Sequence, residues 1–289
     1  MGKQVEELRV PDDGLVCGDV RWWAETKYRL VALYDRLFAT GMKDKWDQRV
    51  YIDLYSGSGF GRVRDTAVVL KGSPILAIDI PHRFDKYIFC EEDHRLLNAL
   101  RSRVERICPT ADVSFIEGSC DSKVDEIIAA IPRASRDRHV LSLCFVDPFD
   151  FGLKFSTIQT LSKVYVDFLV LLAVGMDANR AYDHYVDGKN PKLDEALGNT
   201  DWRERWKSRP RSRDEFLNFV AEEFGSSMTS LGYRKIGPAD MRLVKSDEKN
   251  LPLYYLALFS KSDVAYKYWK EVLKYGTDQM GFAWEESHG

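Results

Sequence analysis

The sequence predicts an α/β fold built on a doubly wound, mostly parallel sheet. Between residues 50 and 173, short apolar runs typical of buried strands alternate five times with stretches of helical character. The first run leads into a glycine-rich loop, and the fourth, residues 140–146, is almost wholly apolar, as expected of a strand buried on both faces. With 289 residues the chain is long enough for a large core, and it shows no internal repeat.

Helical periodicity and turn residues divide the chain into elements. Apolar residues recur at helical spacing over residues 21–39, and Lys27 lies within this predicted helix, where we expect a solvated ammonium. Residues 1–18 are polar and turn-rich and are expected to form an arm, and residues 63–72 a connection. Gly72, Ser73 and Pro74 are favoured where a helix starts, with serine as the expected N-cap. Further helices are predicted at residues 73–80, 93–107, 156–163, 214–231 and 263–275, and one more ends at residue 131. Strands are predicted at residues 50–53, 86–91, 113–117, 140–146, 167–173, 240–244 and 253–260.

The last two predicted strands flank a polar turn, which favours an antiparallel hairpin at the sheet edge. We therefore expect a single domain over residues 1–289. Its parts are an N-terminal arm and helix (1–45), a ligand-binding core (46–176), a helical insertion or cap (177–233), and a closing hairpin and helix (234–289).

Composition favours a soluble protein of the cytoplasm. The formal net charge is −3, so the chain as a whole has no attraction for nucleic acid or an anionic membrane. Its five cysteines form no C-x-x-C pair and lie among apolar residues, which indicates reduced core residues and neither a metal site nor a disulfide framework. The longest apolar run, residues 168–176, is far too short to cross a bilayer, and the N-terminus lacks the apolar stretch of a signal peptide.

The loop after the first strand has the pattern of a nucleotide-like ligand site. Asp53 ends the strand, and Tyr55, Gly57 and Gly59 follow within the loop. Glycine tolerates a positive φ and lets a ligand approach the backbone where a Cβ would collide. In open α/β sheets such a loop holds a ligand beyond the carboxyl ends of the strands. An ordinary glycine turn is the alternative interpretation.

The type of ligand follows from two residues near this loop. A dinucleotide fingerprint requires a third glycine where Arg62 stands, so a nicotinamide or flavin cofactor is disfavoured. The acidic strand end at Asp53 fits S-adenosyl-L-methionine (SAM) better, because a carboxylate can engage the ammonium group of that ligand.

The second and third strands also end in polar residues. Glu91, Glu92 and Asp93 follow the second strand, and a carboxylate there is what the ribose hydroxyls of a bound adenosine require. Glu91 is the best placed, whereas Asp93 is expected to cap the next helix. Three acids at a helix start also suit the helix dipole without any ligand. After the third strand, Ser119 and Asp121 are candidates for contact with an adenine edge.

The fourth strand runs into the main catalytic candidate, Asp147, Pro148 and Phe149. A carboxylate and the carbonyl of a proline peptide can accept both hydrogens of an exocyclic amine, and an aromatic ring can stack on a flipped base. The reaction then depends mainly on positioning. Asp-Pro-aromatic is also a common turn. The five histidines are isolated and show no zinc spacing, so no metal site is expected.

A basic segment within the insertion is a candidate nucleic-acid contact. Cations occupy every second position, with two tryptophans between them; they are Arg203, Arg205, Lys207, Arg209, Arg211 and Arg213. In an extended conformation they would lie along one side, where phosphates favour them and the tryptophans could stack on bases. In a helix the cations would scatter and the tryptophans would become core anchors, which is the alternative interpretation.

Taken in order, five stretches resemble the three-Cys-motif partner protein family of class I methyltransferase-like proteins, and the resemblance covers about residues 23–269. They are Tyr51 to Leu54 with the glycines, Gly72 to Pro74, Phe89 to Asp93, Phe145 to Phe149, and Asp167 to Leu169, joined by a closing strand at residues 254–261. The resemblance implies a Rossmann-like SAM fold and a partner that carries a three-cysteine motif and resembles iron–sulfur radical proteins. It also assigns Asp53, Gly57 and Gly59 to the first SAM motif and Glu91 to the ribose.

The chain departs from the family pattern at two places. Gly118-Ser119 stands where Gly-Asp is usual, and Asp150-Phe151 precede Gly152 where a glycine usually follows the aromatic residue. The second proline of DNA amino methyltransferases is also absent after Pro148. Two hypotheses follow: a SAM-dependent methyltransferase acting on an amino group of nucleic acid or of a nucleotide-like substrate, and a non-catalytic accessory subunit of an iron–sulfur partner protein.

Overall fold

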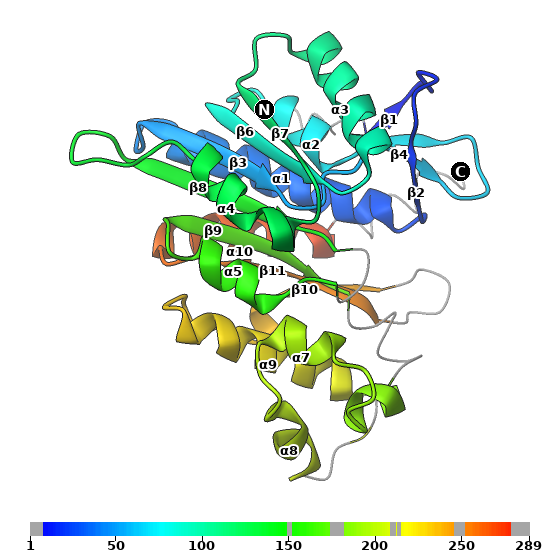
Figure 1. Ribbon diagram of the computed structural model, residues 1–289, viewed down its shortest axis with the longest axis vertical. Coiled ribbons are helices and arrows are strands. Elements are labelled where there is room, and N and C mark those ends of the chain that lie inside the picture. Colours follow the sequence, from blue (N-terminus) through cyan, green and yellow to red (C-terminus); the bar gives the residue numbers. More distant parts are fainter. Residues whose placement is uncertain are drawn as a thin grey trace.

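A computed structural model describes residues 8–148, 152–173, 182–208, 212, 215–245 and 252–278. Residues 275–278 are described as helix backbone only. Its centre is a seven-stranded sheet in the order β10-β11-β9-β8-β3-β6-β7 (Figure 1). β3 pairs in parallel with both β6 and β8, whereas β11 is antiparallel to its neighbours β9 and β10. The strands are β3 (Gln48–Asp53), β6 (Lys86–Glu91), β7 (Val113–Glu117), β8 (Val140–Val146), β9 (Val166–Leu172), β10 (Arg242–Lys245) and β11 (Pro252–Phe259).

Helices cover both faces of this sheet. α1 contacts both α2 and α10 on one face, and α4, α5, α7 and α9 form a continuous series of contacts on the other. Figure 1 shows α4 and α5 in front of the sheet, with α1 and α10 behind it. The predicted mostly parallel, Rossmann-like α/β fold is therefore confirmed. The helices are α1 (Ala24–Met42), α2 (Ser73–Ile78), α3 (His94–Ile107), α4 (Cys120–Ala130), α5 (Phe155–Leu161), α7 (Lys192–Leu197), α8 (Trp202–Lys207), α9 (Phe216–Ser230) and α10 (Asp263–Asp278).

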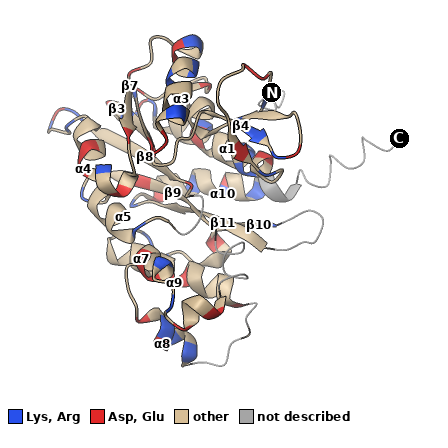
Figure 2. Ribbon diagram, turned by 45° about the vertical axis from the view of Figure 1, so that its right-hand side comes forward, with Lys and Arg blue, Asp and Glu red and all other residues tan. Residues whose placement is uncertain are grey.

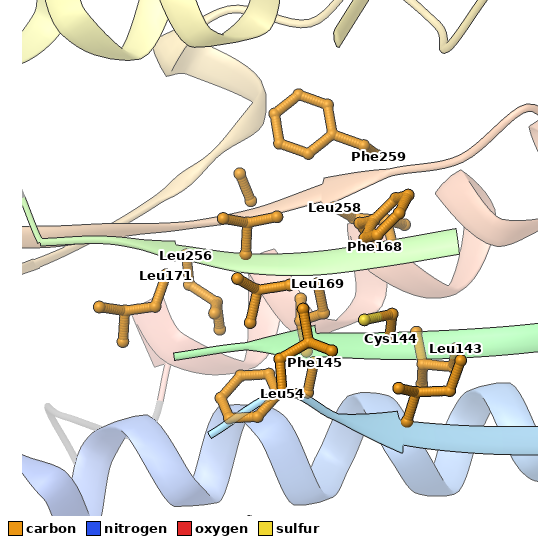
Figure 3. Packing of buried hydrophobic residues seen from close by; sticks show 14 of the residues in the cluster. Leu54, Leu143, Cys144, Phe145, Phe168, Leu169, Leu171, Leu256, Leu258 and Phe259 are labelled. Atoms are coloured by element: carbon orange, nitrogen blue, oxygen red, sulfur yellow. The ribbon is translucent and has the colours of Figure 1, made fainter. Parts of the chain in front are cut away.

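The core lies where the central strands meet these helices. Every residue of β8 and β9 is buried, which explains why both segments are mostly apolar in sequence; Ser142 and Asp167 are the polar residues within them. Figure 3 shows side chains from β8, β9 and β11, among them Phe145, Leu169 and Leu256, packed side by side. Four of the five cysteines are buried, as expected, and Cys17 is half-buried.

Of the two predicted helix N-caps, one is confirmed by the structure and the other is not. Asp93 caps α3 as predicted, because its side chain accepts a hydrogen bond from the backbone N–H of Arg95 at 2.8 Å. The predicted N-cap at Ser73 is wrong by one residue: Gly72 is the N-cap of α2, and Ser73 begins the helix.

A second, smaller sheet draws on segments that were expected to be an arm, the end of the glycine loop and a connection. Its order is β1-β5-β4-β2, with β1 (Arg9–Val10), β5 (Val69–Lys71), β4 (Phe60–Val63) and β2 (Gly18–Val20). β4 and β5 form an antiparallel hairpin directly after the glycine loop, and β1 and β2 add to its two edges. Strands of two to four residues are too short to show an alternating pattern, which is why these assignments were wrong.

The predicted helical insertion contains helical residues 182–186, α7 and α8, and it leads into α9. α9 packs on the main sheet: the ring of Phe224 lies 5.5 Å from that of Phe259 on β11 and 6.0 Å from that of Phe155 on α5, centroid to centroid.

Candidate functional site

Strand register brings three predicted carboxylates to one edge of the sheet. Asp53 at the end of β3 pairs with Phe89 of β6 on one side and with Phe145 of β8 on the other. Glu91 and Asp147 each stand two residues farther along their parallel strands. All three acids therefore lie at the carboxyl edge of adjacent strands, as the sequence predicted.

Asp53 is fully buried, and hydrogen bonds replace only part of the solvation that its carboxylate loses. Its Oδ1 accepts a hydrogen bond from the backbone N–H of Tyr55 at 3.2 Å, and its Oδ2 has no hydrogen-bond partner among the residues that the structure describes. Burial raises the pKa of Asp53 to about 7; nearby Ser73 and the Tyr55 N–H act against that rise, whereas Asp147 and Glu91 add to it. An orphaned buried carboxylate of this kind is typical of a site that a cationic or hydrogen-donating ligand completes.

Glu91 fixes the glycine loop to β6. One carboxylate oxygen accepts from the backbone N–H of Gly57 at 2.8 Å, and the other accepts from the N–H of Asp93 at 2.9 Å. The backbone N–H of Ser56 donates to the carbonyl of Cys90 at 3.0 Å, which adds a second tether. Each carboxylate oxygen has two lone pairs, so Glu91 keeps acceptor capacity for a ligand. The neighbouring Glu92 is exposed.

The two motif glycines have different physical roles. Gly57 has φ +59°, and a Cβ built there meets no described atom within 4 Å, so the space beside it is open. Gly59 has φ +79°, but its Cβ would lie 2.7 Å from Leu100 Cδ1 and 2.9 Å from Ile75 Cγ1. Gly57 thus leaves room for a ligand, whereas Gly59 lets α2 and α3 pack against the loop.

The remaining predicted ligand contacts gather beside Glu91. Gly118 donates its N–H to the Glu91 carbonyl at 2.9 Å, which holds the loop of Ser119 and Asp121 next to β6. Asp121 accepts a hydrogen bond from the hydroxyl of Thr157 on α5. Burial raises the pKa of the Tyr55 hydroxyl, and its neighbour Cys120 adds to this effect. The Tyr55 side chain, which belongs to the glycine loop, therefore lies near Cys120 at the start of α4.

Asp147 has a partner that the sequence analysis missed. The Nζ of Lys27 on α1 lies 2.5 Å from Asp147 Oδ2, and the two side chains are only 13% and 16% exposed. Burial lowers the pKa of Lys27, but the charge of Asp147 and the bond to it raise it more, so the net direction is upward. The expectation of a solvated lysine is therefore wrong.

A signal for this pair was present in the sequence. Lys27 is spaced four residues after Trp23 and four before Val31, so it falls on the apolar stripe of the helix. A cation on such a stripe requires a buried partner. The Nζ of Lys27 also lies 4.7 Å above the Tyr28 ring, and the buried hydroxyl of Tyr254 on β11 has no hydrogen-bond partner among the described residues.

The rest of the catalytic candidate is described only in part. Pro148 is buried and lines a small apolar cavity with Leu153 and Val170. Phe149 lies outside the described residues.

The basic segment adopts the helical alternative over its first three cations, Arg203, Arg205 and Lys207. α8 spans Trp202–Lys207, and both tryptophans are buried. Arg203 binds Asp194 at 2.6 Å and the Tyr185 carbonyl at 2.8 Å, and Arg205 binds Glu223 and Asn199. Lys207 is exposed at the end of α8, and Figure 2 shows basic positions (blue) on the ribbon of this helix at the lower tip. Arg209, Arg211 and Arg213 lie outside the described residues.

A separate polar cleft of about 800 Å³ lies between α5, α7, α8 and α9. Among the predicted site residues that the structure describes, Arg205 alone lines it, and its guanidinium is bound to Glu223 there. This cleft is therefore distinct from the cluster at the strand ends.

No family model and no curated protein matches the sequence. Several solved methyltransferase structures do match. Trm1 from Pyrococcus horikoshii, determined with S-adenosyl-L-methionine, is 9% identical with a TM-score of 0.46, covering 90% of this chain and 63% of that one. The O-methyltransferase from Bacillus cereus in complex with SAH is 11% identical with a TM-score of 0.44, covering 86% and 85%. Precorrin-6y C5,15-methyltransferase from Geobacter metallireducens is 10% identical with a TM-score of 0.42, covering 90% and 100%.

These likenesses concern the chain fold, so what this chain binds must be inferred from its own residues. None of the helices in the described part of the chain combines the length and the apolar character needed to cross a membrane. Within the same residues, no group of three His, Cys, Asp or Glu side chains is arranged to hold a metal ion.

Proposed function

We propose that this protein is a SAM-dependent methyltransferase that acts on an amino group of a nucleic acid or nucleotide-like substrate. The observation that carries the proposal is the buried Asp53 carboxylate, one oxygen of which has no hydrogen-bond partner in the described part of the chain, beside the loop that Glu91 holds open at Gly57. A dinucleotide or other diphosphate would meet the carboxylates of Asp53, Glu91 and Asp147 at this edge. A ligand with an ammonium group and a ribose diol complements them.

Different residues would bind different parts of the ligand. Asp53 would receive the ammonium, Glu91 would accept from the ribose hydroxyls, and the open backbone at Gly57 admits the ligand between them. Tyr55, Ser119 and Asp121 would border the adenine. When bound, SAM supplies a methyl group made electrophilic by its sulfonium.

Asp147 would then orient the amine that receives the methyl group. Lys27 occupies Asp147 Oδ2, so the Oδ1 atom and the Pro148 carbonyl are the acceptors left for the two amine hydrogens. With both hydrogens held, the nitrogen lone pair would be free to accept the methyl group. Transfer would break the C–S bond as the C–N bond forms, and the methylated amine would release one proton to solvent.

Isothermal titration calorimetry with SAM and with its demethylated product, S-adenosylhomocysteine (SAH), tests the cofactor assignment. Asp53→Ala and Glu91→Ala should each abolish saturable binding, because each removes a carboxylate that the ligand needs. Glu92→Ala is the matched control, since its exposed carboxylate adjoins Glu91 in sequence. Asp147→Ala should bind SAM normally and transfer no methyl group, because it removes the acceptor for one amine hydrogen. Wild-type chain that gives no heat with either ligand refutes the assignment.

One observation favours a second function, that of a non-catalytic accessory subunit. The carboxylate expected to hold the substrate amine is already paired with Lys27, which suits a structural role. Such a subunit would bind SAM and co-purify with an iron–sulfur partner carrying a three-cysteine motif. Incubation with radiolabelled SAM and total RNA or DNA distinguishes the two, because only the enzyme transfers label.

A further inference from the structure

Arg103 on α3 is a fully buried cation that joins two distant segments. Its guanidinium donates to both carboxylate oxygens of Asp13, at 2.7 and 3.0 Å, and to the carbonyls of Leu15 and Val16. It also donates to the carbonyl of Ser58 at 2.7 Å. Residues 12–20, here called the strap, are thereby tied to the glycine loop.

The contacts of Arg103 satisfy it without any exposure to solvent. Its side chain is 0% exposed and lies over the Phe60 ring, 4.4 Å from the centroid. Arg103 also holds the pKa of Asp13 well below its usual value. A guanidinium can be buried at this depth only when its donors are paired, and its planar fork matches several acceptors at once.

The glycine loop is therefore anchored from two sides. Glu91 and Cys90 of β6 hold Ser56 and Gly57 by their N–H groups, and Arg103 holds the next residue by its carbonyl. Gly57 and Gly59 both have positive φ, and glycine has many alternative conformations of similar energy. A loop with two such residues needs tethers at both ends to keep one shape.

We propose that Arg103 is a positioning residue that sets cofactor affinity by tying the strap to the glycine loop at Ser58. This inference rests on the proposed SAM site and adds the N-terminal segment to it. Arg103 does not touch the ligand space itself; it keeps Gly57 in the conformation that Glu91 and the ligand require.

Arg106 provides a matched control on the same helix. It binds the same carboxylate, with its guanidinium 2.6 Å from Asp13 Oδ2, but it is 54% exposed, and none of its hydrogen bonds in the described structure reaches the glycine loop. Arg103→Lys keeps the charge and removes the fork. We expect it to weaken SAH binding at least about tenfold in calorimetry, whereas Arg106→Gln should stay within about twofold of wild type.

Hydrogen exchange separates positioning from general loss of stability. In Arg103→Lys, the amides of residues 56–59 should exchange faster while those of β8 keep their protection. Val272→Ala, a buried change on α10 far along the chain, serves as a destabilised control whose SAH affinity and loop exchange should not change. The inference is supported if the melting temperature falls in both variants but the SAH affinity changes only in Arg103→Lys.

Two outcomes overturn it. The first is unchanged SAH affinity in Arg103→Lys, and the second is unchanged exchange at residues 56–59. If wild-type chain binds neither SAM nor SAH, the proposed function fails and the affinity claim with it. The exchange measurement then still decides whether Arg103 orders the loop.

Discussion

Lys27 and Asp147 lie 120 residues apart in sequence, yet Lys27 Nζ and Asp147 Oδ2 are 2.5 Å apart in the structure. The pair joins α1 to the end of β8 at the edge where Asp53 and Glu91 also lie. Because both side chains are largely buried, neither charge can be removed without leaving the other in a poorly solvated place.

Lys27→Met should destabilise the protein by roughly 2–4 kcal/mol, because it leaves Asp147 unpaired. Urea unfolding measures the change, and Lys45→Met, at an exposed lysine, is the control. The pKa of Lys27 lies above its ordinary value of 10.5, so its contribution is fully present below that value and is lost only as pH rises through the folded pKa. The difference between variant and wild type should therefore be the same at pH 7 and pH 9. A loss no larger than that of Lys45→Met would contradict the buried pair.

Asp53 should make stability fall as pH rises. Its folded pKa of about 7 lies above the ordinary value of 3.8, so the folded state binds the proton more tightly than the unfolded chain does. The penalty is absent below about pH 4, grows up to about pH 7 and is constant above it. Asp53→Asn should therefore be more stable than wild type at pH 8, by roughly 2–4 kcal/mol, with the two converging at pH 4. Chemical denaturation at both pH values measures this.

Cofactor binding should show the opposite dependence on pH. A cationic ligand favours the charged form of Asp53, so affinity for SAM should increase as pH rises through about 7. At pH 6 binding should release a proton, which calorimetry detects as a heat that varies with the ionisation enthalpy of the buffer. An affinity that does not change between pH 6 and pH 8 would contradict a role for Asp53.

Alanine at the two motif glycines should separate binding from stability. Gly57→Ala places a methyl group in open space and costs only the strain of a positive φ, about 1 kcal/mol. We expect it to fold and to lose SAM binding. Gly59→Ala drives its Cβ into Leu100 and Ile75 and should cost about 2–4 kcal/mol. Thermal unfolding and calorimetry on both variants check this, and equal melting temperatures would refute the assignment.

Arg203 should stabilise the insertion and contribute nothing to nucleic-acid affinity. Its bonds to Asp194 and to the Tyr185 carbonyl are within the fold, so Arg203→Ala should lower the melting temperature. Its binding to a single-stranded oligonucleotide, followed by fluorescence anisotropy over a salt series, should match wild type. Lys207→Ala, at the exposed end of α8, is the control for a solvated cation. A reduced salt slope in Arg203→Ala would restore the nucleic-acid hypothesis for this residue.

The meeting of Asp53, Glu91 and Asp147 could be predicted because it depends on few assumptions. Each acid ends a recognisable apolar strand, and parallel strands deliver their carboxyl ends to one edge. Glycine content alone did not show that Gly57 faces open space while Gly59 faces Leu100, since that difference depends on where α2 and α3 pack.

The features that the sequence did not predict all depend on contacts between residues that are distant in sequence. Lys27 looks like any helical lysine until β8 places Asp147 beside it. The two-residue strand β1 acquires its conformation from β5, and its own sequence carries no strand signal. Residues 202–207 have an alternating pattern that fits a strand, but burial of Trp202 and Trp206 against α9 residues Phe216 and Phe219 favours a helix.

The placement of β11 has a consequence for biosynthesis. This strand lies between β9 and β10, but the ribosome makes it only after the whole insertion and β10. Until β11 is synthesised, one apolar edge of β9 has no paired strand. Unpaired strand edges of this kind bind chaperones and are prone to aggregation. The nascent chain can therefore carry Lys27 and Asp147 well before Tyr254 arrives beside them, so the site is completed among the last steps of maturation.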